Sequence, residues 1–201
     1  MNYLKSNPDF LIIGGGIFGS SIAWNLSRRS SGSVLLLERH ELASATTSRA
    51  AGLIRNLNRR QGQTALKTHT IETIEFLSEE LEEPLHWHQV AGLLVAESEA
   101  NISHLETLEK YAFKPFGNFQ WIERDDAEEM VPWLDASRAK KFALLPDDGF
   151  IDPYLFAQFY AKAAKKHGAV LKTGIEVTAL QKSGNRITEF KPRRVESQQD
   201  A

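Results

Sequence analysis

A glycine-rich turn near the N-terminus constrains the fold more than any other feature of this chain. Residues 14–19 read Gly-Gly-Gly-Ile-Phe-Gly and follow directly on the apolar run Phe10–Ile13. That run lacks alternation, as is typical of a parallel strand covered on both faces, and Ile17–Arg29 carries apolar residues at helical spacing. A second apolar run, Val34–Leu37, closes with Glu38. The sequence therefore predicts a strand, a helix and a parallel strand within about thirty residues, which is a complete βαβ unit.

The spacing of the glycines and the acid after the second strand predict a dinucleotide site. Gly14 permits a tight turn, Gly16 lets the backbone approach a pyrophosphate, and Gly19 allows helix and strand to pack closely. The start of the helix offers N–H groups and a partial positive charge to phosphates. Glu38 stands where a carboxylate accepts hydrogen bonds from a ribose. The predicted cofactor contacts of this unit are Gly14, Gly16, Ile17, Phe18, Gly19, Glu38 and Arg39.

Composition and charge argue against several classes of protein. The 201 residues carry a formal net charge of -2 from mixed acids and bases, so the chain has no basic stripe for nucleic acid. The absence of cysteine excludes disulfides and thiolate chemistry. His86 and His88 would share one face of a strand, but no third ligand accompanies them, and no metal site is predicted. The sequence shows no membrane span and no targeting segment, so we expect a cytoplasmic protein.

The loop after Glu38 bears on which cofactor binds, because NAD and FAD share the βαβ unit. In this loop, residues 44–55 read Ser-Ala-Thr-Thr-Ser-Arg-Ala-Ala-Gly-Leu-Ile-Arg. The chain resembles the FAD-dependent oxidoreductases that include D-amino-acid, glycine and sarcosine oxidases and dimethylglycine dehydrogenase. The likeness reaches as far as Phe190. The segments that carry it are residues 14–38, 44–55, 92–94 (Gly-Leu-Leu), 146–153 (Pro-Asp-Asp-Gly-Phe-Ile-Asp-Pro) and 168–177.

The resemblance implies further site residues. In similar proteins the Ser/Thr-rich loop wraps the pyrophosphate and the flavin edge, which nominates Thr47, Ser48 and Arg49. The strand residue Val177 would offer its backbone to the adenine, and the guanidinium of Arg55 would hold a substrate carboxylate. Some relatives attach FAD covalently through a histidine at the position of Arg49, so we expect a non-covalent FAD here. A polar solvent loop, a core valine and an exposed surface arginine stay open as the plainer interpretations.

The resemblance also implies a reaction. It is the FAD-dependent oxidation of the C–N bond of a small amine or amino acid, of the sarcosine, glycine, dimethylglycine, proline or D-amino-acid type, by hydride transfer to flavin. Relatives are considerably longer, so we expect a truncated form, completed by a missing C-terminal half or by a second chain. Two alternatives remain, an NAD(P)-binding dehydrogenase and a non-catalytic FAD-binding subunit or fragment.

The remaining patterns predict an α/β fold. We expect a Rossmann-like FAD-binding unit with a parallel sheet, and part of an α+β substrate domain with antiparallel strands. Ala91-Gly92 is expected to turn a hairpin, and Asp152 with Pro153 opens a helix that runs to His167, with Gly168 as its left-handed cap. The expected division is residues 1–84 and 146–190 for the incomplete FAD-binding domain, 85–145 for the partial substrate domain, and 191–201 for a polar tail.

Overall fold

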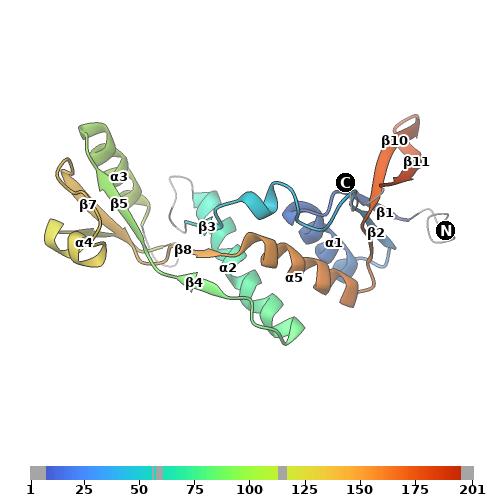
Figure 1. The fold of residues 1–201 in the computed structure, drawn as a ribbon, viewed down its shortest axis with the longest axis horizontal. Helices are drawn as coiled ribbons and strands as arrows, with labels where there is room; N and C mark the ends of the chain where they lie inside the picture. Colours follow the sequence, from blue (N-terminus) through green and yellow to red (C-terminus); the bar gives the residue numbers. More distant parts are fainter. Residues whose placement is uncertain (1–7, 56, 58–60, 113–116, 196–201) are drawn as a thin grey trace, which may run out of the picture. The chain divides into compact units, whose positions relative to one another are not determined.

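The structure is a computed structural model that describes residues 8–55, 57, 61–112 and 117–195. The chain forms two compact units (Figure 1). Unit 1 comprises residues 1–50, 77–85 and 152–201, and unit 2 comprises residues 51–76 and 86–151. The sequence-based division assigned residues 51–76 and 146–151 to the first domain, whereas the structure places them in unit 2. The reason is strand pairing, because β3 (Leu53–Ile54) pairs with β8 (Gly149–Ile151).

Unit 1 contains the predicted parallel sheet, in the order β1-β2-β9. All four residues of β2 are buried, as expected for a strand covered on both faces. The helices α1 and α5 pack against each other, and the Trp24 and Tyr160 rings lie 5.4 Å apart between them. The elements of unit 1 are β1 (Phe10–Ile13), α1 (Ile17–Arg29), β2 (Val34–Leu37), η2 (Thr47–Arg49), α5 (Pro153–Lys166), β9 (Val170–Lys172), β10 (Ile175–Ser183) and β11 (Arg186–Arg194).

The ends of α5 confirm the prediction from the sequence. The Asp152 side chain accepts hydrogen bonds from the backbone N–H groups of Tyr154 at 2.8 Å and Leu155 at 3.0 Å, which caps the helix start. Gly168 adopts a φ of 89°, the left-handed conformation that commonly follows a helix end. Local sequence signals therefore fix both ends of this helix.

The other face of the sheet packs against the β10–β11 hairpin. Leu35 and Leu37 cluster with Ile175, and Val177 and Phe190 pack against that cluster. The prediction of a polar tail from residue 191 is wrong for residues 191–194, because β11 continues to Arg194 and pairs with β10. Backbone pairing supports this polar strand although its side chains add little to a core. The rest of the predicted tail, residues 196–201, lies outside the described residues.

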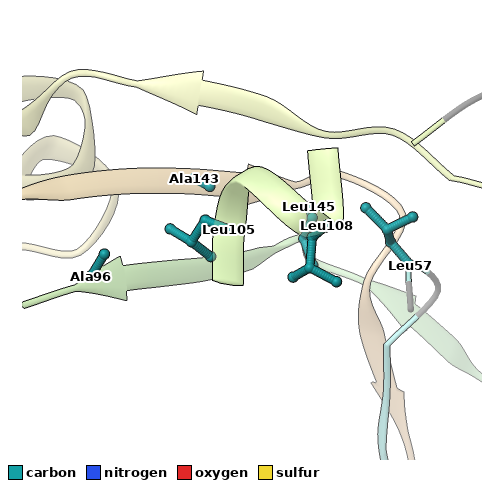
Figure 2. Packing of buried hydrophobic residues seen from close by; sticks show 6 residues of the cluster. All are labelled: Leu57, Ala96, Leu105, Leu108, Ala143 and Leu145. Carbon is teal, nitrogen blue, oxygen red and sulfur yellow. The ribbon is translucent and has the colours of Figure 1, made fainter. Parts of the chain in front are cut away.

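Unit 2 holds two small antiparallel sheets, in the orders β3-β8-β4 and β5-β7-β6. Leu105 and Leu108 of α3 pack with Ala96, Ala143 and Leu145 in a core shown in Figure 2. A second cluster joins α4 to β7. The further elements are β4 (Trp87–Gln89), β5 (Gly92–Ala96), α3 (Glu99–Tyr111), β6 (Gln120–Ile122), α4 (Arg124–Met130) and β7 (Lys141–Leu145), while α2 (Gln61–Leu81) contributes to both units.

The predicted hairpin at Ala91-Gly92 is wrong. β4 pairs with β8, and β5 pairs with β7, so the two strands belong to different sheets. A two-residue type I′ turn needs positive φ at both central residues, but only Ala91, at 64°, has it. The chain therefore turns from one sheet into the next instead of reversing. Among the described residues, no helix combines the length and the apolar character that crossing a membrane requires.

Candidate dinucleotide site

Steric constraints explain two glycines of the N-terminal turn. Gly14 has a φ of 102° and donates its N–H to the Leu37 carbonyl at 2.8 Å, which forms the predicted tight turn. A Cβ added at Gly19 would lie 1.8 Å from the Gly14 carbonyl oxygen, so only glycine allows this approach of helix and loop. At Gly16 an added Cβ would lie 3.0 Å from Thr47 Oγ1. The tight turn and the close packing are confirmed, and the contact with a pyrophosphate stays a prediction.

The start of α1 carries both engaged and free N–H groups. Gly15 N donates to Glu38 Oε2 at 2.7 Å, and Ile17 N donates to Thr47 Oγ1 at 3.1 Å. The N–H groups of Gly16, Phe18 and Gly19 make no hydrogen bond with any other described residue. Free amides at a helix start attract an anion, because the helix dipole adds a partial positive charge there. The Thr47 hydroxyl thus occupies one donor and leaves an anion-binding set beside it.

The Glu38 carboxylate is held by backbone at the end of β2. Besides the bond from Gly15, its Oε1 accepts from the His40 N–H at 2.8 Å. Gly15 is required by the approach of this acid and the next loop, since an added Cβ would lie 2.4 Å from Leu42 Cδ2 and 3.1 Å from Glu38 Cβ. Sequence reasoning gave Gly15 no role. Its only signal in the sequence is its place between Gly14 and Gly16 in a run of three glycines.

The loop after β2 folds back on the glycine turn. Ala43 N donates to the Gly15 carbonyl at 2.9 Å, and Ser48 N donates to the Ala43 carbonyl at 3.1 Å. The Thr47 side chain is buried by this arrangement, at 9% exposure, while Phe18 is 82% exposed. Loop and turn enclose a cleft of 390 Å³ within unit 1. Its lining residues are Ile13, Gly14, Gly16, Ile17, Phe18, Gly19, Glu38, Ala43, Ser44, Ala45, Thr46, Thr47 and Ala50.

The structure brings most of the predicted cofactor residues together at this cleft and leaves four outside its lining. Arg39, Ser48 and Arg49 are exposed, and the Ser48 hydroxyl donates to the Ala45 carbonyl at 3.0 Å. Val177 packs in the core below the sheet, so its side chain has a structural role, and its backbone role stays a prediction. The cleft residues missed from sequence include Ser44 and Thr46, although they lie in the Ser/Thr-rich segment that suggested this loop.

Arg55 belongs to unit 2 and forms an ion pair there. Its Nε lies 3.5 Å from Asp148 Oδ2, with the Arg55 side chain 48% exposed. The two residues continue the register of β3 and β8, in which Leu53 pairs with Phe150 and Ile54 with Gly149. No role was predicted for Asp148, because only the folded sheet brings it beside Arg55.

His86, just before β4, and His88 within β4 make contacts between aromatic rings. His88 stacks on Phe150 with ring centroids 4.8 Å apart, and the His86 ring lies 6.1 Å from it. Throughout the described part of the chain, no group of three or more His, Cys, Asp or Glu side chains could hold a metal ion.

The residues around the cleft fit a dinucleotide. Free amides of a helix start suit a diphosphate, a carboxylate at the end of the second strand suits a ribose, and 390 Å³ lies within the range of small-molecule sites. The fold and the site have the features of a βαβ dinucleotide-binding unit. A sequence model of the family described as FAD dependent oxidoreductase matches residues 9–200. The chain belongs to this family.

Individual relatives agree with this membership. The chain is 32% identical over 186 residues to the mitochondrial dimethylglycine dehydrogenase of Homo sapiens, with 88% of the chain and 20% of the relative covered. It is 27% identical to the 4-methylaminobutanoate oxidase (formaldehyde-forming) of Paenarthrobacter nicotinovorans, with 92% of the chain and 22% of the relative covered. The chain therefore spans about a fifth of the length of these relatives.

Solved structures resemble the chain over nearly its whole length. The L-proline dehydrogenase of P. horikoshii matches 93% of the chain with a TM-score of 0.80 and 26% identity, and 49% of that protein is covered. The glycine oxidase of Bacillus cereus matches 92% of the chain with a TM-score of 0.75, and 53% of it is covered. At 23% identity the second likeness supports the fold alone.

Proposed function

We propose that this chain is the FAD-binding part of an oxidoreductase that oxidises the C–N bond of a small amine or amino acid. One observation carries the proposal: the free amides of Gly16, Phe18 and Gly19 and the carboxylate of Glu38 meet at one cleft. Membership in the FAD dependent oxidoreductase family supports FAD over NAD(P). The relatives suggest the substrate class, since dimethylglycine, 4-methylaminobutanoate and proline, after which they are named, each combine an amine with a carboxylate.

The residues take different parts in this proposal. The amides at the start of α1 bind the diphosphate, and Glu38 accepts hydrogen bonds from the ribose. Arg55 of unit 2 binds the substrate carboxylate. The redox chemistry, acceptance of a hydride from the carbon next to nitrogen, would be supplied by FAD when it is bound. We keep Arg39, Ser48, Arg49 and Val177 as proposed contacts whose side chains lie outside the cleft lining.

A titration of the purified chain with FAD tests the site. We expect FAD to bind and NADH to bind much more weakly. Glu38→Gln should weaken FAD binding by about tenfold or more, because a hydrogen bond to a charged group contributes about 1.5–3 kcal/mol. Glu41→Gln is the matched control, since Glu41 is an exposed acid three residues further on. Binding is followed by quenching of flavin fluorescence.

Two results would contradict the proposal. One is NADH binding tighter than FAD binding. The other is a chain that does not bind FAD at saturating concentration, either alone or when joined to the remaining part of a longer protein.

Acid precipitation tests the non-covalent attachment, which predicts that all flavin stays in the supernatant. Measured oxidation of dimethylglycine or sarcosine would separate an enzyme from a non-catalytic FAD-binding subunit.

The surroundings of the chain form part of the same proposal. We propose that a C-terminal part or a second chain completes the FAD-binding domain, because the solved relatives are about twice as long as the matched region.

We also propose a cytoplasmic location, with mitochondria as the alternative that the names of some relatives suggest. Cell fractionation with an antibody against unit 1 distinguishes the two.

A further inference from the structure

The proposed function leaves unexplained how the end of α2 is held within unit 1. Residues 77–85 belong to this unit, and their acidic side chains are Glu79, Glu80, Glu82 and Glu83. The last turns of α5 and its C-cap carry the opposite charge, in Lys162, Lys165, Lys166 and His167. Because the C-terminal end of a helix dipole is partially negative, cations are favoured at both of these helix ends.

The Glu80 carboxylate is the centre of this contact. Its side chain is 11% exposed, and its two oxygens are engaged by different helices. Oε2 accepts from the indole N–H of Trp24 on α1 at 3.1 Å, and Oε1 contacts Nε2 of His167, the C-cap of α5. The Glu80 carbonyl also accepts from Lys166 Nζ. One acid thus ties three helices together, and an acid with so little access to water depends on these partners.

The imidazole differs from the other ionisable groups of the contact in how it titrates. Carboxylate, ammonium, guanidinium and phenol groups ordinarily keep their charge between about pH 5 and 8, whereas imidazole changes its charge in that range. Lys162 Nζ pairs with Glu83 Oε2 at 2.6 Å, and the Arg28 guanidinium lies 4.1 Å from the centroid of the Trp24 ring. The other ionisable groups are Glu79 and Glu82 of the α2 end and Tyr160, Lys165 and Lys166 of α5.

We propose that His167 and Glu80 form a pH-sensitive clasp at the end of α2. At low pH an imidazolium faces both the carboxylate and the negative end of α5, and both interactions gain from its charge. At high pH the neutral ring offers at most an ordinary hydrogen bond from Nε2, and the attraction to the helix end is lost. The clasp is therefore tight at low pH and loosens as the pH rises. Since α2 contributes to both units, its hold in unit 1 depends on pH.

Hydrogen exchange of the full chain tests the clasp through residues 77–85. The amides of Glu82 and Glu83 donate there to the carbonyls of Glu79 and Ser78. Their protection factors, corrected for the intrinsic pH dependence of exchange, should fall about tenfold from about pH 5 to about pH 8, the equivalent of about 1.4 kcal/mol. Peptides from β2, which is buried along its whole length, are the internal reference and should show no such change.

Variants separate the clasp from general effects of pH. His167→Gln keeps a hydrogen-bond donor without a titratable charge, so protection of residues 77–85 should stay at or below the high-pH level at both pH values. His167→Arg carries a permanent charge and should keep protection high at both. His69→Gln is the matched control, because His69 lies on the same helix, is 69% exposed and pairs with Glu72 instead. This control should keep the wild-type pH dependence.

Two results would overturn the inference. One is wild-type protection of residues 77–85 that does not fall as the pH rises. The other is a pH dependence that survives unchanged in His167→Gln. Circular dichroism checks that each variant is folded, and if His167→Gln is not, Glu80→Gln decides, because removal of the carboxylate should abolish the same pH dependence. The measurement needs no FAD, so its outcome is independent of the proposed function.

Discussion

The cleft of unit 1 and the Arg55–Asp148 ion pair of unit 2 differ in which parts of the chain supply the positive charge. At the start of α1 the donors are backbone amides, and glycines shape their surroundings. In unit 2 the charges belong to the side chains of the Arg55–Asp148 ion pair. A substitution removes a side-chain charge directly, whereas backbone donors can be disturbed only by steric change. The two sites should therefore respond to different kinds of mutation.

The largest expected effect comes from Gly19→Ala in unit 1. The added Cβ would meet the Gly14 carbonyl oxygen at 1.8 Å, and backbone on both sides must move to relieve it. We expect the free energy of unfolding to fall by about 3 kcal/mol or more, the upper range for overpacking. Urea unfolding followed by tryptophan fluorescence measures it. An unfolding free energy within error of the wild type would show that the close approach of helix and turn is wrong.

Alkaline pH tests the packing of unit 1, because its buried phenol, Tyr160, has a pKa that burial raises. Burial of Tyr160 between α1 and α5 raises its pKa from 10.0 to about 12. Between these two values the unfolded state loses the proton and the native state keeps it, so stability falls as pH rises through this window and is unaffected below it. At about 1.4 kcal/mol per pH unit, we expect a loss of about 2 kcal/mol by the upper end.

Tyr160→Phe should remove that part of the pH dependence. Tyr154→Phe is the matched control, since Tyr154 lies on the same helix and is 39% exposed. Urea unfolding across the alkaline range measures the slopes. If Tyr160→Phe and the wild type lose stability in parallel, the phenol does not titrate as its burial requires.

Gly92→Ala tests the other side of the comparison in unit 2. Here the added Cβ meets Asp148 Oδ2 at 2.8 Å, a side-chain atom that can move more readily than backbone. We expect a cost of about 1 kcal/mol, together with a weaker pairing of Asp148 and Arg55. Urea unfolding of the variant and of the wild type gives the cost. A cost as large as that of Gly19→Ala would remove the distinction between the two sites.

The same distinction explains how far the sequence could predict this molecule. The βαβ unit, the Asp152 cap and the Gly168 helix end were predictable, because neighbours along the chain determine each of them. The ion pair of Asp148 was not, since its partner Arg55 follows β3 and the two residues meet only in the fold. The Ala91-Gly92 hairpin failed for a similar reason, because the strands on either side pair with β8 and β7 instead of with each other.

Strand β11 shows a further limit of composition as a guide. Its last residues are polar, which is typical of a tail, yet backbone pairing extends the hairpin as far as Arg194. The guanidinium of Arg193 also pairs with the Glu176 carboxylate across the two strands. A hairpin of this kind is specified by cross-strand partners, which a pattern of apolar residues does not reveal.

The smallest effect is expected where neither site is involved, at the end of α2. Glu82 N donates to the Glu79 carbonyl and Glu83 N to the Ser78 carbonyl, both at 3.2 Å, the same pair of bonds that closes α5 at Gly168. Glu82 adopts a φ of 54°, which costs a residue with a Cβ about 1–2 kcal/mol. Glu82→Gly should therefore raise the free energy of unfolding by about 1 kcal/mol, less the entropy that glycine adds to the unfolded chain. Gly168→Ala, whose added Cβ meets no atom within 4 Å, is the reciprocal control and should lower it by a similar amount. Opposite signs in urea unfolding would show that backbone conformation alone sets these two helix ends, and a destabilised Glu82→Gly would contradict it.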